Sequence, residues 1–252
     1  MERPTVLIGR PRYELKFIID LSAKESLIQA IRGALTTDKN GDRFGAYRVS
    51  SLYYDTEDLQ AYYEKLDGVL RRQKYRLRYY GEPQDSPEVA FFEIKHRFAN
   101  LISKERMRLS PETTRALLSL EAPLRSLSDT PEAPQTPLVG RMLRASLHRP
   151  LKPAVIVSYL REAWVGTDDP DLRVTFDHVI EGFLPGDYLS PGKVSGRACL
   201  PPDQLVLEVK FDHFLPRWLR QRLVQRGLRP VRYSKYLEAA DACQLVAVGG
   251  AR

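Results

Sequence analysis

The sequence has few of the residues on which metal centres, disulfide frameworks and zinc knuckles depend. Its 252 residues include two cysteines, Cys199 and Cys243, and four histidines. Two cysteines so far apart provide neither a disulfide framework nor a zinc knuckle, and they favour a reducing compartment. The histidines are dispersed and none has the spacing of a zinc site.

Motifs for covalent catalysis are also missing. Ser190 and Ser195 lie in a Gly/Pro-rich stretch without an assignable general base. The chain contains no glycine-rich phosphate loop of the nucleotide-binding kind. A mechanism through a covalent protein intermediate is therefore not favoured.

Long apolar runs are absent as well. No stretch approaches the roughly 18 uninterrupted apolar residues of a membrane span. The first residues, Met1-Glu2-Arg3-Pro4, lack the basic start and apolar run of a secretory signal. The sequence predicts a cytoplasmic protein with no transmembrane segment of its own.

The composition supports a folded and moderately basic protein. A hydrophobic content of 43% and an aromatic content of 10% are enough for a core. Lys and Arg number 39 against 32 Asp and Glu, a net charge of +7. This excess alone fits nucleic acid, an anionic membrane surface, a phosphate-rich ligand or no specific ligand. A single domain over residues 1–252 is expected.

Basic residues recur at alternating positions of strand-like segments. Residues 74–80 read Lys-Tyr-Arg-Leu-Arg-Tyr-Tyr, residues 91–97 read Phe-Phe-Glu-Ile-Lys-His-Arg, and residues 104–109 read Lys-Glu-Arg-Met-Arg-Leu. Side chains alternate between the two faces of a strand, so the charges share one face and the apolar residues share the other. Several such strands predict a sheet that is rolled around a positively charged lumen.

The predicted elements are mostly strands with helices between them. Strands are expected over residues 13–19, 47–55, 70–80, 88–98, 101–109, 154–165, 172–183 and 204–211. Helices are expected over residues 22–35, 58–65, 111–120, 138–149, 216–225 and 234–246, the first opened by a capping box at Ser22-Ala23-Lys24-Glu25. Residues 121–137 are proline-dense and predict a surface loop, and residues 185–202 predict an irregular excursion. This order is typical of an α+β protein.

The ordered set of short motifs resembles the VTC domain, a branch of the triphosphate tunnel metalloenzyme (CYTH-like) superfamily. The matching pieces are RYELK at 12–16, SLYYD at 51–55, YRLRYYG at 75–81, FEIKHR at 92–97, SKER at 103–106, LRVTFD at 172–177, LEVK at 207–210 and YSKY at 233–236. The resemblance spans nearly the whole chain. It implies an eight-stranded antiparallel β-barrel tunnel with helices packed outside, which holds triphosphate or polyphosphate.

The same resemblance implies an activity and one departure from the wider superfamily. Eukaryotic VTC domains of this type polymerise polyphosphate from ATP with a divalent metal. In the superfamily the first strand carries Glu-x-Glu-x-Lys, whereas Arg12 stands at the first acidic position here. One potential metal ligand is thereby lost, which moves the chain toward VTC-type lumens and away from the hydrolases and cyclases.

A set of basic residues is expected to line the tunnel. Guanidinium groups can bind phosphoryl oxygens in pairs, and lysines act as point charges. The alternative, an ordinary solvated strand face, is weakened because the apolar face can be covered by helices. The predicted reaction-centre cations are Lys16, Arg76, Arg78, Lys95, Arg161, Arg173 and Lys210. Lys104, Arg106, Arg232, Ser234 and Lys235 are expected to bind phosphate, the last two at a helix start.

Glu208 is the expected metal ligand, with Glu14 and Glu93 as helpers. Mg²⁺ and Mn²⁺ prefer oxygen and often take one or two protein carboxylates beside substrate phosphates. The alternative is that Glu208 and Lys210 merely form an ion pair on the sheet. Mn²⁺ or Mg²⁺ is the predicted cofactor.

The favoured function is a polyphosphate polymerase that transfers the terminal phosphoryl group of ATP. A non-catalytic polyphosphate- or triphosphate-binding module and an inorganic triphosphate hydrolase remain alternatives. Nucleic acid is not expected as a partner, since the aromatic residues lie mostly on the strand face opposite the Lys and Arg residues rather than among them. A membrane-protein partner, and through it membrane association, is a further expectation from the resemblance.

Overall fold

The strands of the chain form one continuous antiparallel sheet. The computed structural model describes residues 7–81, 89–131, 133, 137–189 and 195–246. The strands are β1 (Leu7–Ile8), β2 (Arg12–Asp20), β3 (Leu35–Thr37), β4 (Ala46–Asp55), β5 (Arg71–Tyr80), β6 (Ala90–Phe98), β7 (Leu101–Leu109), β8 (Lys152–Gly166), β9 (Arg173–Phe183), β10 (Arg197–Ala198) and β11 (Gln204–Phe211). The helices are α1 (Leu21–Ile31), α2 (Gln60–Leu66), α3 (Pro111–Leu118), the 3₁₀ helix η1 (Leu124–Asp129), α4 (Pro137–Ala145), α5 (Pro185–Leu189), α6 (Arg217–Gln225) and α7 (Lys235–Ala242).

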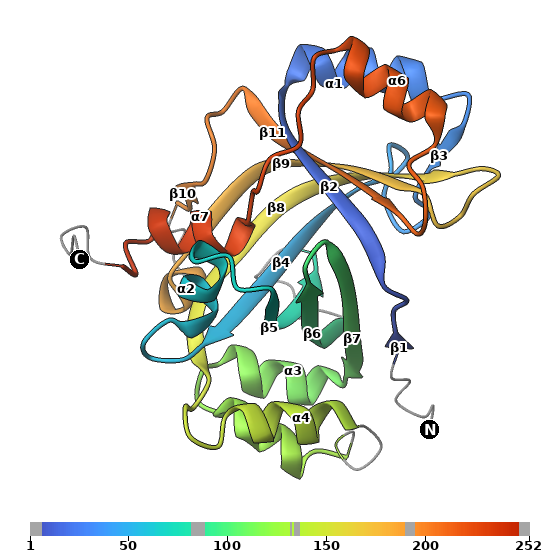
Figure 1. Cartoon of the computed structure of the whole chain (residues 1–252). Coiled ribbons are helices and arrows are strands. Elements are labelled where there is room, and N and C mark those ends of the chain that lie inside the picture. Colours follow the sequence, from blue (N-terminus) through green and yellow to red (C-terminus); the bar gives the residue numbers. More distant parts are fainter. Residues whose placement is uncertain (1–6, 82–88, 132, 134–136, 190–194, 247–252) are drawn as a thin grey trace.

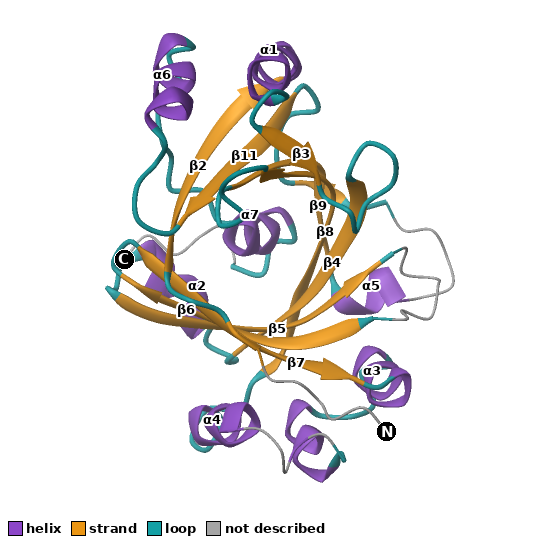
Figure 2. Ribbon diagram, turned by 90° about the vertical axis from the view of Figure 1, so that its right-hand side faces the viewer, coloured by secondary structure: helices purple, strands orange, loops and turns teal. Residues whose placement is uncertain are grey.

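Eight of these strands close into a ring. The order is β9-β11-β2-β7-β6-β5-β4-β8, and β8 pairs in turn with β9. Figure 2 looks into this ring, with α7 visible through it, while Figure 1 shows α7 at one end of the barrel. The predicted eight-stranded α+β barrel is therefore confirmed. The short strands β1, β3 and β10 extend its rim.

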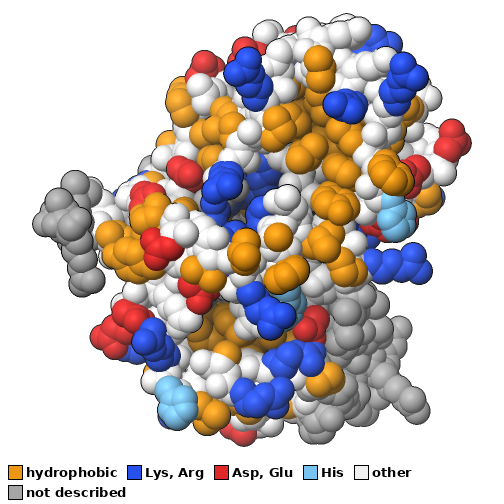
Figure 3. All heavy atoms as spheres, viewed as in Figure 1, with side chains coloured by type: hydrophobic (Ala, Val, Ile, Leu, Met, Phe, Trp, Pro, Cys, Tyr) orange, Lys and Arg blue, Asp and Glu red, His pale blue; other side chains and the backbone are white. Residues whose placement is uncertain are grey.

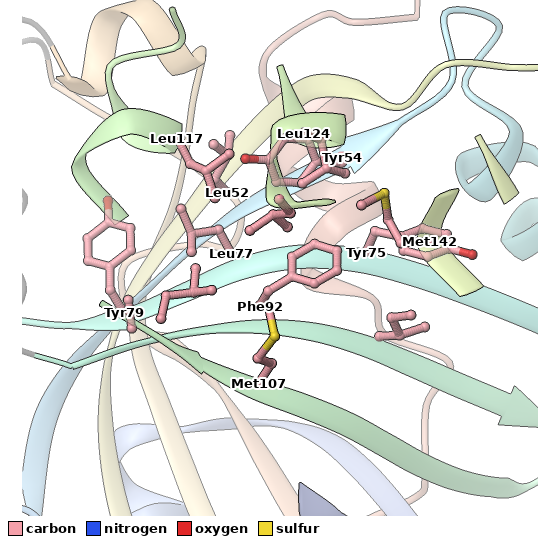
Figure 4. Close-up of a cluster of buried hydrophobic side chains, with 14 of the residues drawn as sticks. Leu52, Tyr54, Tyr75, Leu77, Tyr79, Phe92, Met107, Leu117, Leu124 and Met142 are labelled. Carbon is pink, nitrogen blue, oxygen red and sulfur yellow. The ribbon is translucent and has the colours of Figure 1, made fainter. Parts of the chain in front are cut away.

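The apolar faces of the strands point outward under helices. On β5, β6 and β7 the side chains of Leu77, Phe92 and Met107 are fully buried and lie in one cluster with residues of α3, η1 and α4 (Figure 4). The alternation read from the sequence thus assigns the correct face. Because the outer face is apolar and covered, the charged face of the same strands is left to the lumen.

Two further clusters cover the rest of the barrel. Phe17, Phe176 and Leu207 pack beneath α1 and α6, the two helices at the top of Figure 1. Val155, Ile180 and the small residues of α7 form the third cluster. The barrel wall is therefore supported from outside on several sides.

Helix α7 approaches the barrel closely because Gly182 lies beneath it. A Cβ atom at Gly182 would come within 2.9 Å of the Ala239 side chain. The buried Asp55 carboxylate adds a polar anchor, accepting hydrogen bonds from the Tyr236 hydroxyl at 2.5 Å and the Ala61 amide at 2.9 Å. These contacts fix α7, and with it Lys235, across one end of the tunnel.

Most predicted elements are present, with corrections at their ends. The N-cap of α1 is Asp20, whose Oδ1 accepts from the Ala23 amide at 2.7 Å, so the predicted capping box at Ser22 is wrong. The same helix ends at Ile31 rather than residue 35, because Leu35 begins β3. Helix α4 ends at Ala145 rather than residue 149, and α7 begins at Lys235 and ends at Ala242 rather than spanning residues 234–246.

The two segments expected to be irregular contain short helices. The proline-dense segment 121–137 includes η1, whose Leu124 and Leu127 are buried in the cluster beneath the barrel. Within residues 185–202 the chain forms α5 and β10. Ser190 lies outside the described residues, and Ser195 lies outside any element. No helix in the described part of the chain is long and apolar enough to cross a membrane.

The burial of η1 predicts that this segment contributes to stability. Replacing Leu127, which is 0% exposed, by alanine should lower the free energy of unfolding by about 2–4 kcal/mol, through lost burial and the cavity left behind. Leu147→Ala is the matched control, since Leu147 is 70% exposed. Urea denaturation followed by circular dichroism measures both. Equal small effects would show that η1 does not belong to the core.

Candidate functional site: a charged tunnel

Two adjoining cavities run through the barrel and share its central residues. The cavity toward α7 has a volume of ≈ 110 Å³ and the one toward the opposite end ≈ 730 Å³. The residues that line both cavities are Glu14, Arg76, Arg78, Lys95, Ile102, Arg161 and Lys210. Five of these seven are cations, and they come from four different strands of the ring, β5, β6, β8 and β11. Figure 3 shows Lys and Arg side chains in a hollow of the surface between α7 and β2.

Arg76 and Arg78 project from β5 toward the buried Glu93 of β6. Arg76 donates twice to the same oxygen, Glu93 Oε2, from Nε at 2.7 Å and from Nη2 at 2.5 Å. Arg78 donates from Nε to the Ser51 hydroxyl at 3.2 Å, and its Nε lies 3.9 Å from the same carboxylate. Burial opposes ionisation of Glu93, but Arg76 and Arg78 hold its pKa below the usual value. Glu93 and Ser51 thus hold the guanidinium groups of Arg76 and Arg78 in the wall of the barrel.

Glu208 is surrounded by cations. Its Oε1 accepts from Lys235 Nζ at 2.7 Å, and its Oε2 lies 3.0 Å from Lys210 Nζ. Lys16 and Arg161 approach the same carboxylate at 3.4 Å each. Although burial works against the charged form, these four cations hold the pKa of Glu208 well below its ordinary value. Glu208 is therefore ionised and engaged by protein cations on both oxygens.

Asp177 of β9 is a second buried carboxylate in the same group. Arg161 donates to it from Nε at 2.7 Å and from Nη2 at 2.8 Å, and Lys235 Nζ lies at 2.5 Å. Burial favours the neutral forms, but Asp177 and Glu208 raise the pKa of Lys235 above its usual value. Two carboxylates thus share two cations inside the barrel, where salt screens them little.

Glu14 of β2 joins this group to Lys95 of β6. Lys95 Nζ lies 3.4 Å from Glu14 Oε2, and Lys16 Nζ lies 3.3 Å from Oε1. Burial lowers the pKa of Lys95 to about 8, and Glu14 offsets only part of that shift. Lys95 therefore changes its charge near neutral pH, unlike the arginines beside it.

The remaining predicted residues lie toward the two ends of the tunnel. Lys104, Arg106 and Arg173 line only the larger cavity. Arg173 pairs with Asp38, and the Arg106 guanidinium lies 4.6 Å from the Phe91 ring centroid. Arg232 is exposed and lines neither cavity, so the structure does not bring it into the group.

Ser234 and Lys235 lie at the start of α7 and line the narrower cavity. Ser234 makes no side-chain capping bond. Its hydroxyl accepts instead from Lys74 Nζ at 3.0 Å. The ordinary N-cap interpretation of this serine is thus not what the structure shows, and its hydroxyl is available to the tunnel.

The oxygen donors suit a hard divalent cation, but they do not form a closed site. Within the described residues no group of three or more His, Cys, Asp or Glu side chains gathers to hold a metal. Glu208 and Glu14 flank Lys16, so one or two carboxylates are available at that place. Such a number fits Mg²⁺ or Mn²⁺ shared with substrate phosphates. The Oε2 atom of Glu93 is engaged by Arg76, while its buried Oε1 has no hydrogen-bond partner among the described residues and lies 3.7 Å from Lys104 Nζ.

Sequence reasoning missed several residues of the tunnel, among them Asp177, Lys74 and Tyr159. Asp177 lies two residues beyond Thr175 and four beyond Arg173 on β9, so alternation alone could have placed it on the lumen face. Lys74 alternates with Arg76 and Arg78 in the same way. Tyr159, whose ring lies 4.9 Å from Lys235 Nζ, gave no signal, because an aromatic residue on a strand usually belongs to the core.

A closed antiparallel ring around a charged lumen is the triphosphate tunnel fold, and solved structures share it. HpAC1 from Hippeastrum, a candidate adenylyl cyclase with a dominant triphosphatase activity, has a TM-score of 0.53 at 12% identity, covering 92% of this chain and 95% of that one. A candidate adenylate cyclase from Bacillus halodurans has a TM-score of 0.53 at 13% identity, covering 87% and 91%.

The sequence itself matches the VTC domain family over residues 11–243. The chain therefore belongs to the VTC domain family, as the motifs indicated. Among curated protein sequences, none matches it significantly.

Asp177 and Glu208 share Arg161 and Lys235, so removing one of the two carboxylates should change both the stability of the barrel and its response to an anion. Asp177→Asn should lower the free energy of unfolding by about 3 kcal/mol, because Arg161 and Lys235 lose a buried counter-charge. The melting temperature in calorimetry measures this loss. Tripolyphosphate should then raise the melting temperature of the variant more than that of the wild type, since the lumen is more positive.

The control for this substitution is Glu57→Gln, which removes a carboxylate from the exposed pair with Lys152. It should change neither the melting temperature nor its rise with tripolyphosphate, because exposed ion pairs contribute little to stability. A smaller response of Asp177→Asn to tripolyphosphate would contradict the assignment of the lumen as the anion site.

Proposed function

We propose that this protein transfers the terminal phosphoryl group of ATP to a polyphosphate chain inside the tunnel, with a divalent metal. The observation that carries the proposal is the convergence of Arg76, Arg78, Lys95, Arg161 and Lys210, from four strands, on the part of the tunnel common to both cavities. A closed barrel keeps them at fixed positions. The membership of the VTC domain family supports the same conclusion.

The fixed cations supply what phosphoryl transfer requires. The reaction needs alignment and neutralisation of charge on the phosphoryl oxygens, and little covalent chemistry from the protein. Arg76 and Arg161 are each held by two hydrogen bonds to one carboxylate, so their remaining donors are oriented before substrate arrives. Such preorganised donors stabilise developing charge without reorganisation. Lys95 on β6 and Lys210 on β11 add point charges to the same part of the tunnel.

A divalent metal would be held by Glu208, with Glu14 beside it, and by the phosphates of the substrate. When bound, it would neutralise charge on the phosphoryl oxygens. Mn²⁺ and Mg²⁺ both suit these donors. The cations on Glu208 would then exchange this carboxylate for phosphate oxygens.

A non-catalytic phosphate-binding module is the second candidate, and one observation favours it. Carboxylates weaken anion affinity, so a pure binder gains nothing from them at the phosphate site. In this structure, however, Glu93, Asp177 and Glu208 each pair with buried cations. They therefore have a structural use in the empty tunnel that requires no catalysis. Transfer to water, which would make the protein a triphosphate hydrolase, uses the same tunnel.

Binding should depend on the number of linked phosphates. Tripolyphosphate should raise the melting temperature clearly more than orthophosphate at equal concentration, because it contacts several fixed cations at once and binds the native state only. The shift should shrink as salt is added, since electrostatic contacts at the tunnel mouths are screened. Differential scanning fluorimetry measures both effects. Equal protection by sulfate at matched ionic strength would indicate nonspecific charge pairing.

The variant Glu208→Gln distinguishes the two candidate functions, an enzyme and a binding module. It keeps the size of the side chain but removes the charge that attracts a metal, so synthesis of polyphosphate from ATP and Mn²⁺ should fall roughly 10²-fold or more. Binding of polyphosphate should survive or tighten. Arg78→Ala should weaken both, because it removes a contact to the polyanion. Gels stained for polyphosphate and binding isotherms measure the two properties.

Asp177→Asn is the matched control for this test, because Asp177 contacts the same Arg161 and Lys235 as Glu208 does. It removes an equivalent structural charge without removing the proposed ligand. Equal losses of synthesis in the two variants would contradict the assignment of Glu208 as the metal ligand. If the wild type binds polyphosphate tightly but shows no metal-dependent turnover of ATP or triphosphate, the protein is a binding module and the proposed enzymatic function is wrong.

A further inference from the structure

Three lysines lie directly opposite one another on neighbouring strands of the tunnel wall. Lys74 of β5 pairs in register with Lys95 of β6, which pairs with Lys104 of β7. Like charges directly opposite destabilise a sheet unless something neutralises them. Lys95 has Glu14 at 3.4 Å and Lys104 has Glu93 at 3.7 Å. The third lysine of this row lacks such a partner.

Lys74 has no carboxylate oxygen within 4.0 Å among the described residues. Its half-buried Nζ donates to the Ser234 hydroxyl at 3.0 Å and lies 4.6 Å from the centroid of the Tyr236 ring. Both contacts come from the α7 end of the tunnel. A hydroxyl and an aromatic face are weak partners for a half-buried ammonium, since neither carries a negative charge.

The other elements around Lys74 present mainly positive charge. Lys95 acts on it from β6, Lys16 from β2 and Lys65 from α2, while Asp55 of β4 has an opposing and smaller effect. Burial, followed by the three lysines, lowers the pKa of Lys74 well below its ordinary value. The amine is therefore short of a counter-charge in the empty tunnel.

The position of Lys74 indicates which part of a ligand it meets. It lines only the narrower cavity of ≈ 110 Å³, whereas the cavity on the opposite side has ≈ 730 Å³. Sites for drug-sized molecules occupy about 300–1,000 Å³, so a nucleoside suits the larger side. A phosphate chain is slender and charged along its whole length, which suits the narrower side.

Building on the proposed function, we propose that Lys74 and Ser234 form a further phosphate-binding position, for a unit of a condensed phosphate chain that extends past the shared cations toward α7. The bound phosphate supplies the missing negative charge. Lys74 then takes up a proton from solvent as the chain binds, and the Ser234 hydroxyl becomes free to donate to a phosphate oxygen.

This coupling gives binding a particular pH dependence. An anion beside Lys74 favours its charged form, so the pKa rises on binding. Between the pKa of the empty state and that of the bound state, each unit of rising pH should weaken binding, by up to about tenfold for one linked proton. Above about pH 7 the ligand itself hardly contributes, because its terminal phosphates are already largely ionised.

The experiment is isothermal titration of the whole protein with polyphosphate of about ten units above about pH 7, in buffers of different ionisation enthalpy, which yields the protons taken up on binding. Lys74→Met should bind roughly 10- to 100-fold more weakly, through loss of a charge-assisted contact. It should also take up fewer protons than the wild type. Lys95 and Lys104 lie beside Lys74 and can also exchange protons. The result is therefore the difference in proton uptake between the wild type and Lys74→Met.

Two further variants separate charge from structure. Lys74→Arg carries a permanent charge, so it should retain most of the affinity while losing the same part of the proton uptake. Lys152→Met removes an exposed lysine paired with Glu57 and should leave affinity and uptake unchanged. Melting temperatures of the ligand-free proteins show whether each variant is folded.

The outcomes are distinguishable. A lower melting temperature of Lys74→Met with unchanged affinity and proton uptake would make Lys74 a structural residue and overturn this inference alone. Failure of the wild type to bind either tripolyphosphate or the longer chain would overturn the proposed function, and this position with it. Wild-type binding that is pH-independent above about pH 7 would also contradict proton uptake at Lys74.

Discussion

The architecture depends on neutralising cations that the fold buries inside its barrel. Arg76, Arg161 and Lys235 are each at most 7% exposed, and isolated charges in such places cost several kcal/mol. Glu93, Asp177 and Glu208 lie beside them as counter-charges. Removing one member of such a group leaves the others uncompensated, which ties the stability of the barrel to the chemistry of its lumen. The apolar clusters outside hold the strands so that these pairs meet.

A bound polyanion would change this balance rather than simply add to it. Phosphate oxygens can take over the cations that Glu208 engages, and the released carboxylate is then available to a divalent metal. Ligand and metal binding should therefore support each other in the tunnel, since each removes a repulsion that the other would meet. At Lys74 no such exchange is needed, because no carboxylate oxygen of the described residues lies within 4.0 Å of its Nζ, which donates to Ser234 instead.

Alternation on single strands predicted which face of β5, β6 and β7 is charged, and the order of motifs predicted the ring. The first follows from local periodicity within one sequence, whereas the second follows from the resemblance of the ordered motifs to the VTC domain. The pairing of Arg161 with Asp177 could not be predicted, because it depends on the register between β8 and β9. The exposed position of Arg232 was missed for a related reason, since the path of the chain before α7 depends on long-range contacts with β2. Leu127 was assigned to a loop because prolines concealed a short buried helix.

The central claim is that a condensed phosphate lies along the barrel axis among fixed cations. A crystal structure of the protein with tripolyphosphate tests it directly. The account predicts phosphate density inside the barrel, with oxygens within hydrogen-bond distance of Arg76, Arg161 and Lys210 and with Glu208 released from at least one of its cations. Density confined to the outer surface, with the carboxylate pairs of the lumen unchanged, would contradict it.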